Sequence, residues 1–162
     1  MLMNEPIKVE IELVHEDSHP LHRSTKHAAG YDIYSIVNEE IPPLGWKTIP
    51  TGVKIKSMPP WMEGQVRTRS GMASKHGVFV MNSPGTIDPD YRGEIKIILM
   101  NMGHLPYDIE SGDRIAQIVF NQYISPELNA VVINHNIRGE KGLGSTGTKS
   151  NLLTDSLIGG SW

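Results

Sequence analysis

Apolar and charged residues alternate at the start of the chain, from Ile7 to Leu13. A period of two is typical of a β-strand with one buried face. Further short apolar runs follow, separated by turn-forming residues such as Pro42-Pro43 and Pro84-Gly85. This spacing predicts an all-β domain, a β-sandwich or barrel. The later strands are expected at 46–49, 52–55, 65–68, 78–80, 94–100, 114–120 and 129–133.

Long helices are not expected, because the chain holds 11 proline and 16 glycine residues. The sequence favours at most a single helical turn, at 24–29 or at 126–129. From Arg138 to Ser150 the chain is rich in Gly, Ser, Thr and Lys, a composition that buries too little surface to fold alone. We therefore predict a β-domain over 1–137 and a C-terminal arm over 138–162 that needs a partner to become ordered.

Composition narrows the class of protein. A chain of 162 residues fits one domain, and a net charge of -3 with both signs dispersed gives no electrostatic footprint for nucleic acid. The absence of cysteine excludes disulfides, thiolate zinc sites and a cysteine nucleophile. No apolar run approaches the roughly 20 residues of a membrane span, and no secretory signal pattern opens the chain. We expect a soluble protein with no membrane partner, cytoplasmic, or inside the host cell if the source is viral.

Polar clusters taken one at a time are ambiguous. Asp88 to Tyr91 is equally typical of a turn between strands. The glycines between Arg138 and Gly147 let backbone N–H groups converge on an anion, and the arginine and hydroxyls there add charge-assisted bonds. This indicates a phosphate cradle, with a flexible linker as the alternative. His15, His19, His22 and His27 lack metal-ligand spacing, which favours a solvated loop over a zinc site.

Five segments, taken together and in chain order, resemble the motif set of the trimeric dUTPase family. The resemblance covers most of the chain and implies a dUTPase-like β-sandwich or barrel of the distorted jelly-roll type, assembled as a homotrimer. It also implies hydrolysis of dUTP to dUMP and pyrophosphate with Mg²⁺. The five segments are Ala29 to Asp32, Arg69 to Gly77, Asn82 to Glu94, Gly112 to Gln117, and Arg138 to Gly147.

For the phosphates and the metal, the resemblance implies a site built from two subunits. Asp32 and Gln117 hold Mg²⁺ through water, in keeping with the tendency of Mg²⁺ to retain waters in protein sites. Gln117 also contacts substrate. The other phosphate ligands are Arg69, Ser70 and Gly71 from one subunit and Arg138, Gly144, Ser145 and Thr146 from another.

For the nucleoside, the resemblance implies that Asn82 to Ile87 form a hairpin whose backbone pairs with uracil. A site that would leave buried polar groups unpaired rejects cytosine strongly. Tyr91 lies under the deoxyribose and leaves no room for a 2′-hydroxyl. Asp88 deprotonates the water that attacks the α-phosphorus. The uracil contacts within the hairpin are Asn82, Gly85, Thr86 and Ile87.

Two features depart from the family pattern. Leu143 stands where many members carry an aromatic residue over the uracil, and an aliphatic cap excludes water but does not stack. The chain also continues past Thr148 with an apolar cluster within 149–162. This extension either docks on a neighbouring subunit or remains a free end.

Two other functions are compatible with parts of this pattern. A dCTP deaminase shares the fold, but its catalytic glutamate falls where this chain has Ile98. A protein that keeps the fold only to bind a regulatory partner would not need Asp88, Tyr91 and Arg138 together. The sequence therefore favours the hydrolase.

Overall fold

The computed structural model describes residues 7–130 of the chain. These residues form short strands and a single helix, α1, of seven residues. The elements are β1 (Glu10–Leu13), β2 (Tyr31–Tyr34), β3 (Glu39–Ile41), β4 (Trp46–Ser57), β5 (Met62–Arg67), α1 (Ser70–His76), β6 (Val78–Val80), β7 (Gly85–Ile87), β8 (Glu94–Asn101), β9 (Tyr107–Ile109) and β10 (Arg114–Gln122).

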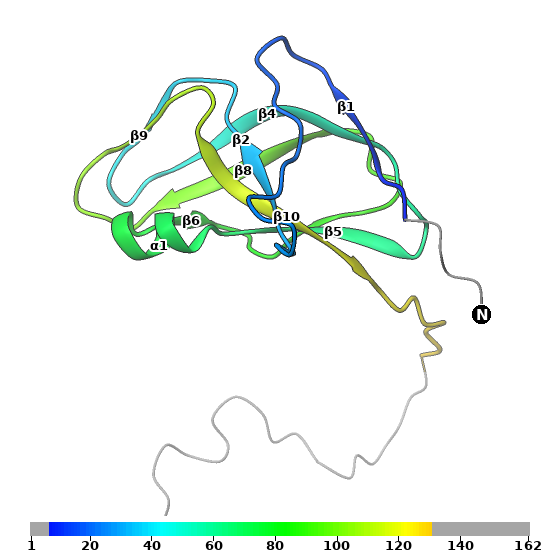
Figure 1. Ribbon diagram of the computed structural model, residues 1–162. Helices are drawn as coiled ribbons and strands as arrows, with labels where there is room; N and C mark the ends of the chain where they lie inside the picture. The colour runs from blue at the N-terminus through cyan, green and yellow to red at the C-terminus, as the bar shows by residue number, and fades with distance from the viewer. Residues whose placement is uncertain (1–6, 131–162) are drawn as a thin grey trace, which may run out of the picture. The chain divides into compact units, whose positions relative to one another are not determined.

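The strands form two four-stranded sheets and a small two-stranded one, all with antiparallel pairing (Figure 1). The first sheet has the order β1-β4-β8-β6, the second β2-β10-β5-β7, and the third pairs β3 with β9. Neighbours in a sheet are mostly distant in sequence, so the chain crosses repeatedly between the sheets. The all-β prediction is confirmed.

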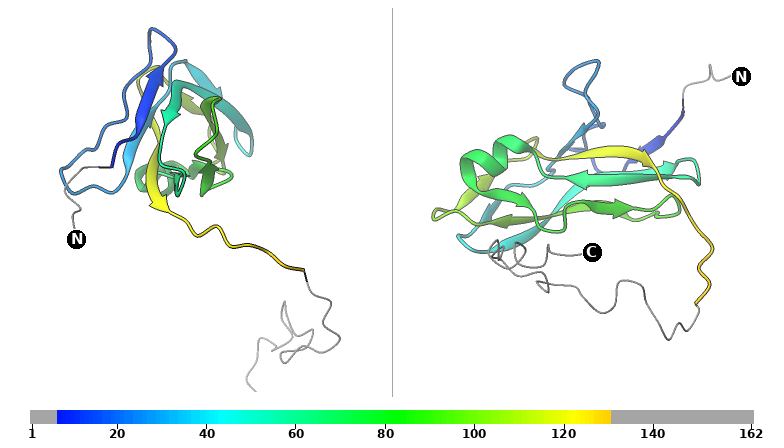
Figure 2. Two further views of the ribbon diagram at one scale, coloured as in Figure 1. Left: turned by 90° about the vertical axis from the view of Figure 1, so that its right-hand side faces the viewer. Right: turned by 90° about the horizontal axis from the view of Figure 1, so that it is seen from below.

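The core lies between the two larger sheets. The left-hand view of Figure 2 shows the strands arranged around a common centre. Ile49 on β4 lies opposite Ile97 on β8, and both are almost fully buried. Ile33 on β2 and Ile118 on β10 are buried from the second sheet. Branched aliphatic side chains suit the pleated surface of a strand, and here they fill the space between two such surfaces.

One row of residues on the outward face of the first sheet is also apolar. Trp46 on β4 lies opposite Met100 on β8, which lies opposite Phe79 on β6. The neighbours of Met100 on β8, Leu99 and Asn101, are buried, so the strand's period of two turns Met100 outward. We call Trp46, Met100 and Phe79 the outer row. A solvated sheet face normally carries polar residues at such positions.

Several predicted elements differ from the observed ones. The strands predicted at 46–49 and 52–55 form one strand, β4, because its ladder with β8 shifts register between Pro50 and Lys54 instead of breaking. The helix lies at Ser70–His76, where none was predicted. Of the predicted helical turns, 24–29 holds one hydrogen-bonded turn, closed by the Ala28 N–H and the Thr25 carbonyl, and 126–129 holds none. The strands β2, β3, β7 and β9 were not predicted, while 78–80, 94–100 and 114–120 agree closely.

Contacts divide the chain into two units, Met1–Ser125 and Pro126–Trp162. The boundary predicted at 137/138 lies outside the described residues, as does most of the strand predicted at 129–133. Within 7–130, no helix has the length and apolar character needed to cross a membrane.

Candidate functional site

Asp32 is the centre of a group of charged and polar side chains. Its backbone N–H donates to the carbonyl of His22 at 2.7 Å, and its side chain is nearly buried. One carboxylate oxygen, Oδ1, lies 3.2 Å from Nε of Arg69. The other, Oδ2, accepts a hydrogen bond from Ser24 at 2.9 Å and pairs with Nη1 of Arg114 at 3.3 Å. Three donors therefore fix this carboxylate in one orientation.

The two arginines reach Asp32 from different elements. Arg69 is the N-cap residue of α1, and its Nη1 also donates to the backbone carbonyl of Arg114 at 2.8 Å. Arg114 is the first residue of β10, which pairs with β2. Two guanidinium groups against one carboxylate leave a formal excess of positive charge. Such a surface suits a strongly anionic ligand.

Gln117 lies beside Asp32 because the β2–β10 ladder pairs the two residues in register. Its Nε2 donates to the backbone carbonyl of Thr68 at 3.0 Å, which fixes the amide. Its Oε1 lies so close to Gly30 that any Cβ there would overlap it. Glycine at position 30 therefore makes room for the amide. We call Ser24, Asp32, Arg69, Arg114 and Gln117 the charged cluster.

This cluster fits a metal bound through water better than a directly bound one. Both oxygens of Asp32 already have partners, and no group of three or more His, Asp or Glu side chains within 7–130 could hold a metal ion. One fixed carboxylate beside one fixed amide supplies hard oxygen acceptors, which is the chemistry that hydrated Mg²⁺ requires.

Ser70 and Gly71 open α1 next to Arg69 and are exposed. A Cβ added at Gly71 would meet nothing within 4 Å, so the chain's own packing does not demand glycine there. The helix ends at Gly77, whose φ of 67° lies in the left-handed region that favours glycine. The first residues of α1 are thus accessible beside the charged cluster.

The segment from Asn82 to Ile87 is not a hairpin of paired strands, contrary to the prediction. Ser83 N–H donates to the carbonyl of Val80, which closes a turn. The strand before this turn, β6, pairs with β8, and the strand after it, β7, pairs with β5. The turn therefore carries the chain from one sheet to the other. Asn82 and Thr86 are exposed on it, and Gly85 packs close to the Asn82 amide.

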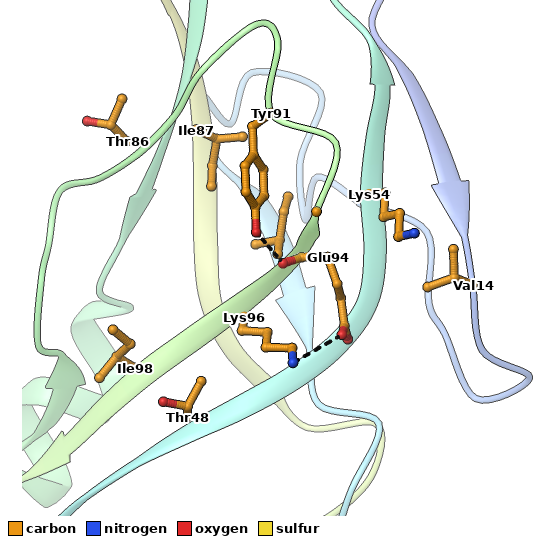
Figure 3. A pocket seen from close by; sticks show the side chains of 11 residues that line it. Val14, Thr48, Lys54, Thr86, Ile87, Tyr91, Glu94, Lys96 and Ile98 are labelled. Carbon is orange, nitrogen blue, oxygen red and sulfur yellow. Dashed lines mark hydrogen bonds and ion pairs between the residues drawn. The ribbon is translucent and has the colours of Figure 1, made fainter.

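A hollow of about 770 Å³ opens beside this segment, and we call it the Tyr91 pocket (Figure 3). Thr86, Ile87 and Tyr91 line one side. Tyr91 is 41% exposed, and its hydroxyl donates to the backbone carbonyl of Glu94 at 3.0 Å. Asp88 is exposed and begins the turn that leads to Tyr91, whose N–H donates to the Asp88 carbonyl. The other lining residues are Val14, Thr48, Lys54, Gly93, Glu94, Ile95, Lys96 and Ile98.

The predicted site residues thus fall into two sets. Asp32, Arg69 and Gln117 gather in the charged cluster, whereas Thr86, Ile87 and Tyr91 line the pocket. No hydrogen bond or ion pair between residues 7 and 130 joins the two sets. The predicted phosphate and lid residues Arg138, Leu143, Gly144, Ser145 and Thr146 lie outside the described residues.

Sequence reasoning missed the parts of the charged cluster that depend on register. Ser24 and Arg114 had no assigned role, although both bind Asp32. Arg114 stood within the quoted Gly112 to Gln117 segment, which was a usable signal. Its pairing with a residue 82 positions away follows only from the β2–β10 ladder. Ser24 lay in a stretch with no local signal of function.

The charged cluster can bind the anionic part of a ligand, and the separate open pocket can bind an uncharged part. The all-β fold with these two features defines the class of protein. The sequence from 16 to 147 matches the dUTPase family. The chain therefore belongs to the dUTPase family.

Relatives in sequence cover most of the chain. The deoxyuridine 5′-triphosphate nucleotidohydrolase of Wolbachia pipientis subsp. Culex pipiens is 44% identical over 153 residues, covering 90% of this chain and 99% of that protein. The protein of the same name from Thermoanaerobacter sp. is 47% identical over 123 residues, covering 74% and 82%.

Solved structures show the same fold. The dUTPase of Staphylococcus bacteriophage 80alpha, in a structure with dUpNHpp, gives a TM-score of 0.74 at 29% identity, covering 86% of this chain and 98% of that one. A mutant dUTPase of phage phi11 of S. aureus, described with a structural Mg(II) ion, gives 0.71 at 27% identity, covering 76% and 96%. The predicted fold class is confirmed.

Proposed function

We propose that this protein hydrolyses dUTP to dUMP and pyrophosphate, which limits uracil entry into DNA and supplies dUMP for dTMP synthesis. The observation that carries the proposal is the ordered set of five dUTPase motifs in a chain of that family. The relatives named above are dUTP nucleotidohydrolases, and the 80alpha enzyme has been solved with dUpNHpp. The expected location is the cytoplasm, or the host interior for a virus.

Asp88 is the proposed general base, which takes a proton from the water that attacks the α-phosphorus. Its support is its exposed position at the turn beside the Tyr91 pocket, where solvent can reach the carboxylate. Tyr91 and the Asn82 to Ile87 segment would receive sugar and base, and Arg69, Ser70 and Gly71 the phosphates. Arg138, Gly144, Ser145 and Thr146 would close over the γ-phosphate.

The proposed metal is Mg²⁺, held through water by Asp32 and Gln117. When bound, it neutralises charge on the phosphate oxygens and aligns them. The fixed Asp32 carboxylate and Gln117 amide support this assignment. Arg69 then has two tasks, since it binds Asp32 in the chain alone and would also meet the phosphates.

We further propose a homotrimer in which each site takes residues from more than one subunit. Two observations support it. The outer row exposes Trp46, with Met100 and Phe79 half-buried, on a sheet face that would otherwise be solvated. The charged cluster and the Tyr91 pocket are also not joined within the described part of one chain.

Turnover assays test the function. Purified protein with Mg²⁺ is expected to release dUMP from dUTP. Formation of dUTP from dCTP would instead indicate a deaminase, and a lack of activity on both nucleotides would indicate a binding protein. Asp88→Asn keeps the shape of the side chain but cannot accept the proton. It is expected to lose about 10²- to 10⁴-fold in kcat while still binding dUpNHpp. A near-normal kcat would remove Asp88 from this role.

Complementation tests the shared site. Asp88→Asn chains and chains truncated before Arg138 are each expected to be nearly inactive, but mixed trimers can contain sites with both intact parts. Mixing after subunit exchange should therefore restore part of the activity. No recovery, with exchange demonstrated by mass-tagged subunits, would contradict sites shared between subunits.

A further inference from the structure

Tyr91 is held in its position by Gly93 and Glu94. Its hydroxyl donates to the backbone carbonyl of Glu94, as the upper dashed line in Figure 3 shows. The ring lies directly against Gly93, where a Cβ would lie 2.5 Å from Cζ and 2.9 Å from Cε2 of the ring. Both distances are well inside van der Waals contact. Any side chain at position 93 therefore forces the ring to move.

Glu94 is in turn fixed to a distortion in the neighbouring strand. Its Oε1 accepts hydrogen bonds from the backbone N–H groups of Thr51 and Gly52, at 3.1 and 2.8 Å. These residues lie where the β4–β8 ladder shifts register, and Gly52 has a φ of 64°. The same carboxylate lies 3.8 Å from Nζ of Lys96. A buried part of β4 thus anchors the residue whose carbonyl receives the Tyr91 hydroxyl.

We propose that Gly93 and Glu94 set the sugar specificity of the site, acting as positioning residues for the ring of Tyr91. The inference rests on the proposed function, in which this ring faces the deoxyribose. An apolar wall that can yield rejects an added hydroxyl only weakly, by about 10²-fold at most. Because Tyr91 is 41% exposed, its ring can yield unless something fixes it. Gly93 fixes the depth of the ring, and Glu94 fixes its hydroxyl end.

A double-mutant cycle tests this route, because it separates an effect that acts through the ring from one that does not. The four proteins are the unaltered chain, Gly93→Ala, Tyr91→Ala and the double variant. The quantity compared is kcat/KM for dUTP divided by kcat/KM for UTP. Gly93→Ala is expected to lower this ratio about threefold to tenfold, the size of one aromatic contact. In the Tyr91→Ala background it should cause no further change.

Two variants at Glu94 extend the test. Glu94→Gln keeps an Oε1 acceptor for Thr51 and Gly52 and is expected to retain the ratio, whereas Glu94→Ala should lower it. In ring-labelled protein, the NMR signals of Tyr91 should shift in Gly93→Ala and Glu94→Ala but not in Glu94→Gln. This readout needs no turnover.

The outcomes separate the two proposals. An equal loss of the ratio in both Tyr91 backgrounds, or no loss at all, would overturn the inference while leaving dUTP hydrolysis intact. Unshifted Tyr91 signals in Gly93→Ala would overturn it as well. If the unaltered protein does not turn over dUTP, the proposed function is wrong and this inference falls with it.

Discussion

The charged cluster and the Tyr91 pocket both carry residues of the dUTPase motifs. They differ in how far the residues of a single chain bury them and supply their partners. In the charged cluster, Asp32 is nearly buried and each of its carboxylate oxygens has a partner. In the Tyr91 pocket, Tyr91 is 41% exposed beside an open hollow. The central carboxylate of the charged cluster thus has its partners within one chain, whereas the Tyr91 pocket exposes surface that another segment or a ligand can cover.

The difference follows from the kinds of force involved. Charged groups bind an anion well only when their positions are fixed in advance, because reorienting them costs free energy during binding. Apolar burial is not directional, so a second surface can supply it late, on assembly or on closing. A shared site can therefore leave apolar contacts to association while the charged cluster is already ordered within each chain.

The largest effect is expected from a charge placed on the outer row. In the proposed trimer, Met100→Asp would bury a carboxylate without a partner in each subunit contact, at a cost of several kcal/mol per ion. We expect the proposed trimer to dissociate and dUTP turnover to fall by more than about 100-fold, a loss of about 2.7 kcal/mol in transition-state stabilisation. Sedimentation and turnover measure the two effects.

Leu105→Asp is the matched control for this substitution, because Leu105 is 77% exposed in the loop between β8 and β9. It should leave assembly and turnover unchanged. A Met100→Asp protein that remains trimeric and active would show that the outer row is not a subunit contact.

The next effect compares the two regions in stability. Asp32→Asn leaves the guanidinium groups of Arg69 and Arg114 without a compensating charge, so we expect the free energy of unfolding to fall by about 1–3 kcal/mol. Tyr91→Ala removes an exposed ring and should cost less than about 1 kcal/mol. Urea unfolding at one protein concentration measures both. Equal losses would contradict the contrast between the two regions.

Strands β8 and β10 were predicted closely because both are long, whereas β4, which is longer still, was predicted as two strands. In β8, Ile95, Ile97 and Leu99 alternate with more exposed residues, so the period of two is visible over the whole strand. The three-residue strands β3, β7 and β9 are too short to show a period. Strand β6 is equally short and was predicted only because Val78 to Val80 is an apolar run. Helix α1 was missed because only Met72 is buried on it, although Gly77 with Lys75 and His76 in the last turn was a C-terminal signal.

The part of the site that could be predicted consists of residues within the five dUTPase motifs. Asp32 and Gln117 were expected to act together, and the β2–β10 ladder pairs them. Local sequence does not show how the strands and loops align, and this alignment brings Arg114 and Ser24 to the carboxylate of Asp32. Gly93 likewise lies in the Asn82 to Glu94 motif, but its contact with the Tyr91 ring depends on how the turn folds back.

The smallest effect concerns whether the C-terminal arm covers the Tyr91 pocket. Leu143→Phe would restore an aromatic side chain where many family members carry one over the uracil. Stacking would act on bound substrate and transition state alike, so it should lower KM and leave kcat nearly unchanged. One aromatic contact is worth about 0.5–1.5 kcal/mol, or about threefold to tenfold in KM.

Steady-state kinetics with dUTP measure the change, with Leu105→Phe as the control on an exposed loop. An unchanged KM would mean either that position 143 does not lie over the base or that another aromatic residue already occupies that face, and Leu143 would then be a spacer.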